Sequence, residues 1–393
     1  MKIAYVCPFY EPTICGVKQV VKELAERMVE RGHEVHVFTS DWDKYQRIKI
    51  REEVINGVRV HRCVHILRVA NFATVWPSVF WKLLNEDFDL IHTHLFGHAH
   101  TFLAALVAKV KNIPHIHTTH CPWSDAYRSP IGRVLLWISY GTLSRLSLKW
   151  AERVIAITPW EIDFIKKFGG DENKIIVLPN GMDDILFERI KPNNFKRKYR
   201  IEGKLALFFG RFNVTKGPEK LAVVAKDIVK ERKDITFVFV GPDEGKKKEV
   251  QDIIKNQKNI LLLDPIRDKR SIAEMYQAAD VYVLPSYREG LPLTLFEAMC
   301  SGLPIVASPV NGIPYEMKDP ENGFFVNYGD LVNLRRKILK ILDNKKIAEK
   351  MRINNLKKAE KYSWDLIGDQ TEEIYLEAVK WFRYQQSTIK EKH

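Results

Sequence analysis

Two glutamates, Glu289 and Glu297, have types and spacing that could serve chemistry on a polar ligand. Glu289 stands in a loop rich in glycine and proline, and Glu297 stands one turn into the helix expected after that loop. Apolar residues surround Glu297 in the sequence, so its carboxylate should be at least half buried and should need hydrogen-bond donors. Sugar or ribose hydroxyl groups would supply them. For an arbitrary pair, a solvated loop residue and an exposed helix residue would be the more common interpretation.

A basic loop, GRFNVTKG at 210–217, follows an apolar run and precedes a helical pattern. It places Arg211 and Lys216 beside a helix N-terminus, where backbone N–H groups and the helix dipole favour a diphosphate. The order of residues differs from that of a Walker A motif. Together with Glu297, the two cations predict a nucleoside diphosphate sugar as the ligand, with its ribose at Glu297. Taken alone, the segment could equally be a solvated basic loop.

The elements that would position these residues form two series of apolar runs that alternate with helical patterns. A charged and irregular stretch, 183–203, separates the two series as an inter-domain connection, and the pattern is typical of doubly wound α/β domains. We therefore predict an N-terminal Rossmann-like domain of residues 1–187 and a second Rossmann-like domain of residues 188–364. The last helix, within 365–393, would cross back to the first domain. Two such domains leave a cleft, which is a common place for a ligand.

Composition limits the kinds of partner. The chain has 393 residues with 62 Lys or Arg against 49 Asp or Glu, and the net charge of +13 favours nucleotides, other polyanions or an anionic membrane face. The sequence carries no pattern of a nucleic-acid-binding module, so nucleic acid is not expected as a partner. The chain enters a strand directly and has no apolar run of about eighteen residues, so we expect a cytoplasmic protein. The many Lys and Glu residues suggest a thermophile.

Three places in the sequence could hold a metal, but each lacks a convincing ligand set. His92 and His94 alternate on an expected strand, within a group of seven histidines: His92, His94, His98, His100, His115, His117 and His120. Their spacing suits ligation, yet nothing supplies a Cys or carboxylate partner. Asp41 with Asp43, and Asp87 with Asp89, resemble Asp-x-Asp metal sites, but each pair stands at an element boundary, where surface aspartates are common. The five cysteines show no C-x-x-C spacing. We expect neither a metal nor another cofactor.

Six motifs occur along the chain in an order and spacing that identify a family. They are Gly16-Val17 with KELAERMVERGHEVHVFT, HTTH ending at His120, PNGMD at 179–183, GRFNVTKG, FVGPDEG at 239–245, and EGLPLTLFEAMCSGLPIVAS. Together they resemble the motifs of retaining glycosyltransferases of family 4 over nearly the full chain, with Glu289 and Glu297 as the family's E-x7-E. The resemblance implies the GT-B fold, in which two Rossmann-like domains face a central cleft.

The resemblance also implies roles for individual residues. Arg211 and Lys216 would bind the donor diphosphate, and Glu297 would bind the ribose hydroxyls. Glu289 would lie beside the transferred sugar, with His120 at the sugar's C6 hydroxyl. The catalytic residues would then be His120, Glu289, Arg211 and Lys216. The remaining donor-binding residues would act through their backbone: Gly16, Gly210, Gly290 and Leu291.

We therefore predict a retaining hexosyltransferase that takes a hexose from a UDP- or GDP-linked sugar and needs no metal. Apart from Glu289, the sequence offers no evident nucleophile. We therefore prefer attack of the acceptor on the same face of the donor sugar to a covalent glycosyl-enzyme intermediate. A nucleotide-sugar epimerase or a glycogen-synthase-like enzyme on the same fold is an alternative, as is a non-catalytic nucleotide-sugar-binding protein. The sequence does not indicate an oligomeric state.

The acceptor is predicted from two aromatic-rich, amphipathic stretches of the N-terminal domain, which faces the acceptor in this family. They span 69–88 and 127–150, and the second carries basic but no acidic residues. Such helices often lie at membrane interfaces and recruit anionic lipid. We predict a glycan or lipid-linked acceptor and a peripheral contact with the cytoplasmic face of a membrane. Ordinary helices packed on the sheet are the alternative.

Overall fold

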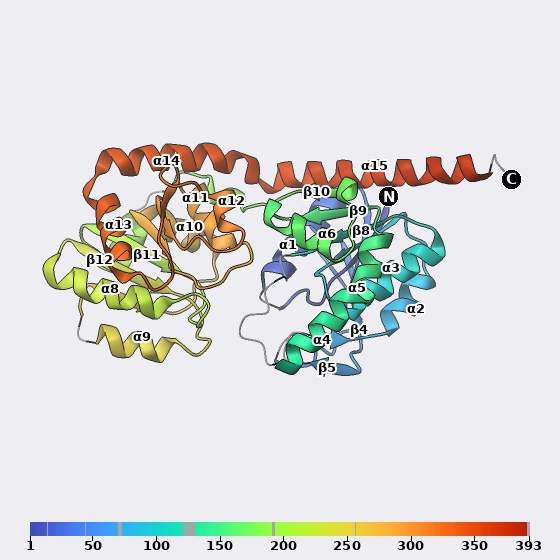
Figure 1. Ribbon diagram of the computed structural model, residues 1–393, viewed down its shortest axis with the longest axis horizontal. Coiled ribbons are helices and arrows are strands. Elements are labelled where there is room, and N and C mark those ends of the chain that lie inside the picture. Colours follow the sequence, from blue (N-terminus) through green and yellow to red (C-terminus); the bar gives the residue numbers. More distant parts are fainter. Residues whose placement is uncertain are drawn as a thin grey trace. The chain divides into compact units, whose positions relative to one another are not determined.

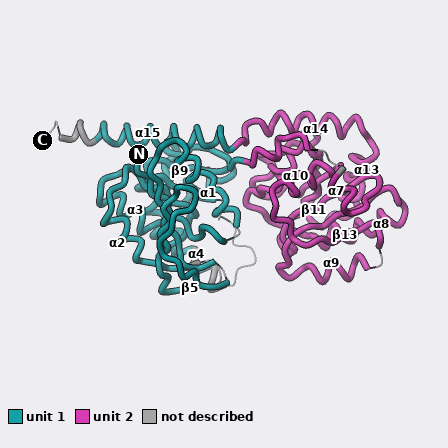
Figure 2. Tube along the Cα trace, turned by 180° about the vertical axis from the view of Figure 1, so that it is seen from behind, with its two compact units in different colours: residues 1–181, 364–393 teal, residues 182–363 magenta. Residues whose placement is uncertain are grey.

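The computed structural model describes residues 1–13, 15–43, 45–69, 73–120, 123, 130–190, 193–255 and 257–390 (Figure 1). The chain divides into two compact units, which we call unit 1 and unit 2. Unit 1 consists of Met1–Gly181 with Trp364–His393, and unit 2 consists of Met182–Ser363 (Figure 2). The chain thus changes unit after Gly181 and after Ser363, whereas the predicted boundaries lie after residues 187 and 364.

Unit 1 is built on a mainly parallel sheet. In the described part of this unit the strand order is β10-β9-β8-β7-β1-β2-β4-β3, with an antiparallel pairing between β3 and β4. The strands are β1 (Lys2–Val6), β2 (Glu34–Ser40), β3 (Glu52–Ile55), β4 (Val58–Cys63), β7 (Leu90–His94), β8 (His115–Thr118), β9 (Arg153–Ala156) and β10 (Ile175–Val177), beside a separate hairpin of β5 (Leu67–Val69) and β6 (Ala73–Val75). The order reverses between β1 and β7, so the loops after these strands lie at the topological switch point, where such sheets bind ligands.

Helices cover both faces of this sheet because the side chains of a strand alternate between the faces. Ile3 and Tyr5 of β1 share a core with α1 (Gly16–Glu30) and α15 (Trp364–Lys390). Ala4 and Val6 share another core with α2 (Ser78–Leu84) and α3 (Ala99–Lys111). The other helical segments are α4 (Pro130–Gly141), α5 (Leu143–Trp150), η1 (Pro159–Glu161), α6 (Ile162–Lys167) and η2 (Glu172–Lys174). The C-terminal helix therefore completes the core of unit 1, as predicted.

Unit 2 is built on a second parallel sheet. Its described strands have the order β13-β12-β11-β14-β15-β16, and neighbouring strands pair in the parallel direction. They are β11 (Lys204–Phe209), β12 (Ile235–Val240), β13 (Ile260–Leu263), β14 (Val281–Leu284), β15 (Ile305–Ala307) and β16 (Gly323–Phe325). The order reverses between β11 and β14, which places the loops after these two strands at the switch point of this sheet.

The helices of unit 2 join the same alternation. They are η3 (Asp184–Leu186), α7 (Asn193–Lys198), α8 (Pro218–Glu231), α9 (Lys247–Ile254), α10 (Lys269–Ala278), α11 (Leu293–Cys300), α12 (Ile313–Glu316), α13 (Leu331–Asp343), α14 (Lys345–Ala359) and η4 (Glu360–Tyr362). The stretch 183–203, predicted to be an irregular connection, instead folds into this unit, because Ile190, Phe195 and Ile201 are buried. The predicted α/β class with two Rossmann-like units is confirmed. No helix among the described residues is long and apolar enough to span a membrane.

Candidate active site

Two loops of unit 2 meet at the switch point between β11 and β14. The first, 210–217, follows β11, and the second, 285–292, follows β14. The backbone N–H of Tyr287 donates to the Thr215 carbonyl oxygen over 2.8 Å and so joins them. Gly217 has a φ of +61°, and a Cβ there would lie 2.4 Å from the Pro285 carbonyl oxygen. Only glycine therefore allows this close approach of the two loops.

Lys216 and Glu289 form a buried ion pair across these loops. The Lys216 ammonium lies 2.6 and 2.7 Å from the two carboxylate oxygens of Glu289, and the side chains are 11% and 5% exposed. The Ser286 hydroxyl donates to Glu289 Oε1 over 2.6 Å, and the Asn311 side-chain amide donates to the Glu289 carbonyl oxygen. Two residues that the sequence singled out for different reasons thus lie together at the carboxyl edge of the sheet.

The Asn213 side chain holds the first loop in shape. Its amide oxygen accepts from the backbone N–H groups of Thr215 and Lys216, over 3.2 and 3.1 Å, and from the Thr215 hydroxyl over 2.8 Å. An asparagine side chain that accepts hydrogen bonds from the backbone two and three residues later stabilises a tight turn. Lys216 therefore leaves the loop from a fixed backbone position.

Arg211 lies at the exposed end of the same loop. Its side chain is 55% exposed, and its guanidinium donates to the two carboxylate oxygens of Glu244 over 3.0 and 3.2 Å. Asn213 also donates to Glu244, over 2.8 Å. The contacts described for Arg211 thus reach the loop after β12, whereas Lys216 reaches the loop after β14.

Glu297 lies on α11, whose residues Leu295, Phe296, Ala298 and Met299 are buried. Its carboxylate accepts a 2.8 Å hydrogen bond from the Tyr276 hydroxyl of α10. Burial raises the pKa of Glu297 to about 7, and the nearby Asp183 carboxylate acts in the same direction. A further hydrogen-bond donor would stabilise the ionised carboxylate, and a diol such as ribose offers two.

The backbone positions predicted for the donor lie at the ends of the same elements. Gly210 follows β11 and donates to the Val240 carbonyl oxygen over 3.0 Å. A Cβ on Gly241 would lie 1.8 Å from the Gly210 carbonyl oxygen, so the ends of β11 and β12 approach closely. Gly290 and the buried Leu291 lead from Glu289 into the first turn of α11.

In unit 1, the predicted donor-binding residue Gly16 is the first residue of α1. Cys15 is the N-cap of this helix, and the Lys18 N–H donates to its sulfur over 3.5 Å. A thiolate or thiol sulfur is a weak acceptor compared with a Ser or Asp oxygen. The Cys15 side chain is therefore turned to its own helix.

His120 follows β8 with a left-handed backbone, at φ +60°. Its Nε2 lies 2.9 Å from Nδ1 of His94, the last residue of β7. Burial lowers the pKa of His120 to about 3, so its ring is neutral at physiological pH. His94 is thus a partner of His120 that the sequence did not identify in this role.

Three further buried histidines, His92, His115 and His117, contact hydroxyl groups. His92 Nδ1 lies 2.6 Å from the Tyr375 hydroxyl of α15, and its Nε2 lies 2.8 Å from the Thr118 hydroxyl. His115 and His117 both bond the Thr93 hydroxyl, each over 2.8 Å. These contacts give the histidines a structural role in the strands.

Two of the aspartates weighed as metal ligands bind protein groups. The buried Asp41 carboxylate lies 2.5 Å from Arg51 and 2.5 Å from His65 Nδ1. Asp89 accepts from the Lys2 backbone N–H over 2.8 Å and from Arg383 over 2.9 Å. Arginine and histidine thus balance the charge of Asp41, and Arg383 that of Asp89.

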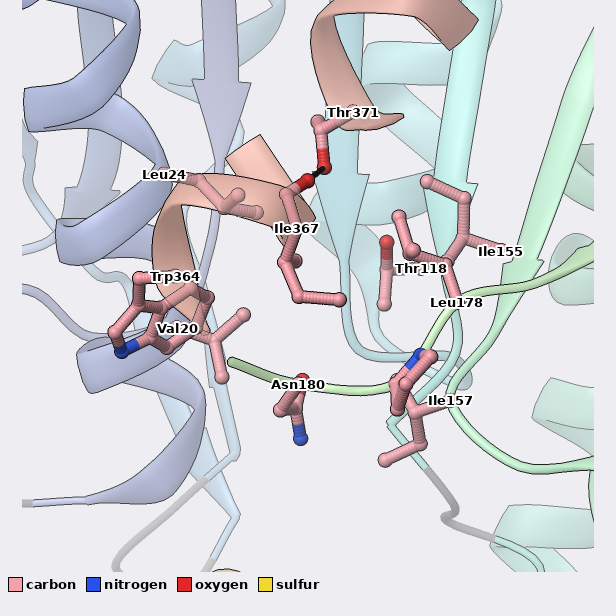
Figure 3. A pocket seen from close by; sticks show the side chains of 11 residues that line it. Val20, Leu24, Thr118, Ile155, Ile157, Leu178, Asn180, Trp364, Ile367 and Thr371 are labelled. Carbon is pink, nitrogen blue, oxygen red and sulfur yellow. Dashed lines mark hydrogen bonds between the residues drawn. The ribbon is translucent and has the colours of Figure 1, made fainter. Parts of the chain in front are cut away.

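A small pocket of unit 1 is lined by mostly apolar side chains of α1, α15 and the ends of neighbouring strands (Figure 3). Asn180 of the PNGMD motif lines it, while Gly181 has no room for a side chain because a Cβ would lie 2.3 Å from the Trp364 ring. The predicted site residues are not among those that line it. The motif therefore joins the end of the sheet to α15.

Five residues of this arrangement are not among the predicted site residues: Asn213, Glu244, Tyr276, Ser286 and Asn311. Asn213 stands inside GRFNVTKG and Glu244 inside FVGPDEG, so the motifs contained a signal for these two. Tyr276 and Asn311 come from other elements, and only the sheet order brings them to Glu297 and Glu289.

Two Rossmann-like α/β units in one chain are the architecture of the GT-B fold. Comparison with known families specifies the class further. The family model for Glycosyltransferase Family 4 matches residues 14–185, and that for Glycosyl transferases group 1 matches residues 191–358. The chain belongs to glycosyltransferase family 4.

Individual relatives agree with this assignment. An uncharacterized glycosyltransferase of Methanocaldococcus jannaschii is 27% identical over 387 residues, which cover 95% of this chain and 93% of the relative. An Escherichia coli UDP-Gal:alpha-D-GlcNAc-diphosphoundecaprenol alpha-1,3-galactosyltransferase is 29% identical over 283 residues, or 68% of this chain and 70% of that one. The structure of HepE from Anabaena, solved with UDP, has a TM-score of 0.75 at 17% identity and covers 95% of this chain and 99% of that chain. This last similarity concerns the fold.

Proposed function

We propose that the protein is a retaining, metal-independent hexosyltransferase that moves a hexose from a UDP- or GDP-linked sugar to a glycan or lipid-linked acceptor. The observation that carries the proposal is the buried Lys216–Glu289 pair at the switch point of unit 2. There a cation for the diphosphate and a carboxylate for the sugar are held against each other. Glu297, with its raised pKa and a single described hydrogen bond from Tyr276, is assigned to the ribose.

The proposed chemistry follows from the charges that develop in the reaction. Cleavage of the anomeric bond leaves negative charge on the diphosphate and positive charge on the sugar ring. Lys216 and Arg211 would stabilise the negative charge on the diphosphate, and the Glu289 carboxylate would stabilise the positive charge on the sugar ring. Preorganised electrostatics of this kind is commonly the largest catalytic term. Lys216 and Arg211 would thus neutralise the diphosphate charge in place of a divalent metal ion.

Retention is assigned to same-face attack, with the leaving phosphate as the base for the acceptor hydroxyl. Glu289 is committed to Lys216 and Ser286 through hydrogen bonds of 2.6–2.7 Å, which favours an electrostatic role over that of a nucleophile. His120, neutral because burial lowers its pKa to about 3, would hydrogen-bond the sugar's C6 hydroxyl without adding charge. Mass spectrometry of a trapped glycosyl-enzyme adduct would overturn this assignment.

The donor is proposed on two grounds besides the site. The Escherichia coli relative is named for transfer from UDP-Gal, and HepE was solved with UDP and with UDP-glucose. The same bacterial relative is named for an acceptor on diphosphoundecaprenol, which supports a lipid-linked acceptor here.

Membrane contact is proposed through α4 and α5. The exposed apolar side chains of α4 include Val134 and Trp137, which are 57% and 74% exposed, and the basic residues Arg145 and Lys149 are exposed on α5. Residues 127–129 of the predicted stretch 127–150, and 70–72 of the stretch 69–88, lie outside the described residues. Co-sedimentation with anionic liposomes should fall for Trp137→Ser and stay unchanged for the control Trp381→Ser on α15, a residue that is 46% exposed and lies outside both predicted stretches.

The proposal is tested by thermal shift against a panel of UDP- and GDP-sugars, followed by transfer assays with soluble and lipid acceptors. Binding of one nucleotide sugar with hexose transfer would support it. A protein that only binds nucleotide sugars is distinguished by His120→Ala. In a transferase this change should slow release of the nucleotide from the donor, and full-rate release would remove His120 from the catalytic residues.

A further inference from the structure

His36, His61 and Glu86 gather in unit 1, away from the edge that carries Gly16 and His120. His36 is the third residue of β2, His61 lies on the neighbouring β4, and Glu86 lies in the loop before β7. One potential ligand atom from each lies within 4.8 Å of the other two. Since the amino ends of β2 and β7 share an edge of the parallel sheet, the cluster lies toward the edge opposite to the switch-point loops.

The hydrogen bonds of the two histidines are unusual. His36 Nδ1 lies 2.9 Å from His61 Nε2 and 3.6 Å from the Glu86 carboxylate. The opposite ring nitrogens each face another carboxylate: His36 Nε2 lies 3.0 Å from Glu34 Oε1, and His61 Nδ1 pairs with Glu52. Ionised carboxylates only accept hydrogen bonds, so both of these outer nitrogens carry the hydrogen.

In neutral rings the two inner nitrogens then face each other with lone pairs at 2.9 Å. A cation between them removes this conflict. A shared proton would serve the two nitrogens alone, whereas a metal ion would accommodate both imidazole lone pairs and the Glu86 carboxylate 3.6 Å from His36 Nδ1.

We propose that His36, His61 and Glu86 form a binding site for a divalent transition-metal ion, and that Zn²⁺ is the ion this ligand set fits best. Zn²⁺ holds imidazole nitrogens at about 2.0–2.1 Å in a tetrahedron, so the nitrogens would move apart to roughly 3.3 Å. Glu34 and Glu52 supply the carboxylate–histidine contacts that orient zinc-bound imidazoles. The fourth position would be left to water.

The burial of the ligands suits entry of an ion from one side. The His36 side chain is 1% exposed, that of His61 18% and that of Glu86 31%. His36 packs edge-on against Phe88, with ring centroids 5.2 Å apart. The Phe88 ring would thus lie behind the ligand His36, and the ion would be open to solvent on the side of Glu86.

Positive side chains also face this cluster. Lys2 Nζ lies 2.7 Å from Glu86 Oε1, which is the oxygen nearest to His36, and Lys82 pairs with Glu52. Arg59 lies 3.6 Å from Glu34. Lys2 therefore competes with the metal for the Glu86 carboxylate, and its removal should strengthen metal binding.

The position of the site predicts a structural effect. The metal would hold β2, β4 and the loop before β7 together, at the edge of the unit 1 sheet opposite to the loops of Gly16 and His120. Chelation should lower the melting temperature of the protein and leave its turnover unchanged. This outcome does not depend on which reaction the protein catalyses.

The experiment uses the full chain, stripped with a chelator and titrated with Zn²⁺ against a chromogenic zinc indicator. We expect about one Zn²⁺ per chain. His61→Ala and Glu86→Gln should each weaken binding at least tenfold, Glu52→Gln should weaken it by about ten- to a hundredfold, and Lys2→Ala should strengthen it. His98→Ala, in the seven-histidine group, is the matched control and should bind like the wild type.

Because His36 is buried, the partly exposed His61 and Glu86 carry the test, and circular dichroism in chelator verifies that these variants fold. Absent binding by the folded wild-type protein would overturn the proposal and assign the pair a shared proton. Binding that survives His61→Ala, or that is lost in His98→Ala, would also overturn it. Weaker binding in Lys2→Ala would contradict the placement of the ion at Glu86.

Discussion

The Lys216 ammonium contacts both carboxylate oxygens of Glu289, at 2.6 and 2.7 Å, where two loops of unit 2 meet. An ammonium has three hydrogens to donate, and two of them serve Glu289. The third suits a phosphate oxygen, which is the acceptor we propose. One ion pair thereby links the residue assigned to the leaving group with the residue assigned to the sugar.

Breaking this pair should destabilise the protein. Lys216→Met or Glu289→Leu leaves one buried charge without its partner, which costs about 3–5 kcal/mol in the free energy of unfolding. The double variant buries neither charge and should cost less than the sum of the single changes. Urea unfolding measures all three. Additive losses would show that the two side chains act independently.

The raised pKa of Glu297 should make stability fall as pH rises. The carboxyl titrates near 4.5 when unfolded and near 7 when folded, so between these values the folded state holds a proton that the unfolded state has lost. This difference lowers the free energy of unfolding by up to about 3 kcal/mol by pH 8. Glu297→Gln should remove the loss, and the difference between variant and wild type should level off below pH 4.5.

The same carboxyl predicts proton release on nucleotide binding. Ribose hydroxyls donate to the ionised form, so binding should lower the pKa of Glu297 and release a proton near pH 7. Calorimetry of UDP or GDP binding in buffers of different ionisation enthalpy measures this release. Glu297→Gln should abolish it, and an unchanged release would assign the proton to another group.

The ion pair with Glu244 should weaken the binding of the donor diphosphate by Arg211. The Glu244 carboxylate holds the Arg211 guanidinium at 3.0 and 3.2 Å, so a diphosphate must compete with it. Glu244→Ala should raise the affinity for nucleoside diphosphate about threefold, and Arg211→Ala should lower it about tenfold. Glu249→Ala on α9, 48% exposed, is the control and should have no effect. Equal affinities in Glu244→Ala and Arg211→Ala would contradict the assignment.

The buried histidines of unit 1 should make the protein acid-sensitive. Burial lowers the pKa of His115 and His120 to about 3, whereas the unfolded rings titrate near 6.5. Below pH 6.5 the unfolded state binds protons that the folded state cannot, so stability falls by up to about 1.4 kcal/mol per histidine per pH unit. Urea unfolding at pH 7.5 and 5.5 measures the loss.

His115→Gln should reduce this pH dependence, and His98→Gln, at a half-buried ring, serves as its control. If both variants kept the wild-type slope, burial of His115 would not be its cause.

Much of the fold follows from the sequence because its signals are local. Buried parallel strands such as β11 and β14 are continuous apolar runs, and their spacing by helical patterns identifies a doubly wound sheet. The prediction that the stretch 183–203 is an irregular inter-domain connection is wrong. The charged residues of this stretch outnumber its apolar ones and hide the pattern of its buried residues. Ile190, Phe195 and Ile201 nevertheless anchor it in the core of unit 2.

The candidate site was only partly accessible in this way. Motifs name Lys216 and Glu289, but the ion pair depends on β11 and β14 being neighbours, which strand order decides. The Tyr276 hydroxyl on Glu297 and the His36–His61 contact join elements whose order the sequence does not state. Side chains that meet across a sheet carry no short-range signal.

The central claim is retention of configuration during hexose transfer, and time-resolved proton NMR of the first-formed product tests it most directly. With an α-linked nucleotide sugar as donor, the account predicts an α-linked product from the outset, and the Lys216→Ala variant should form it about a hundredfold more slowly. Lys230→Ala, exposed on α8, should match the wild type. A β-linked first product, or wild-type rates in Lys216→Ala, would contradict the account.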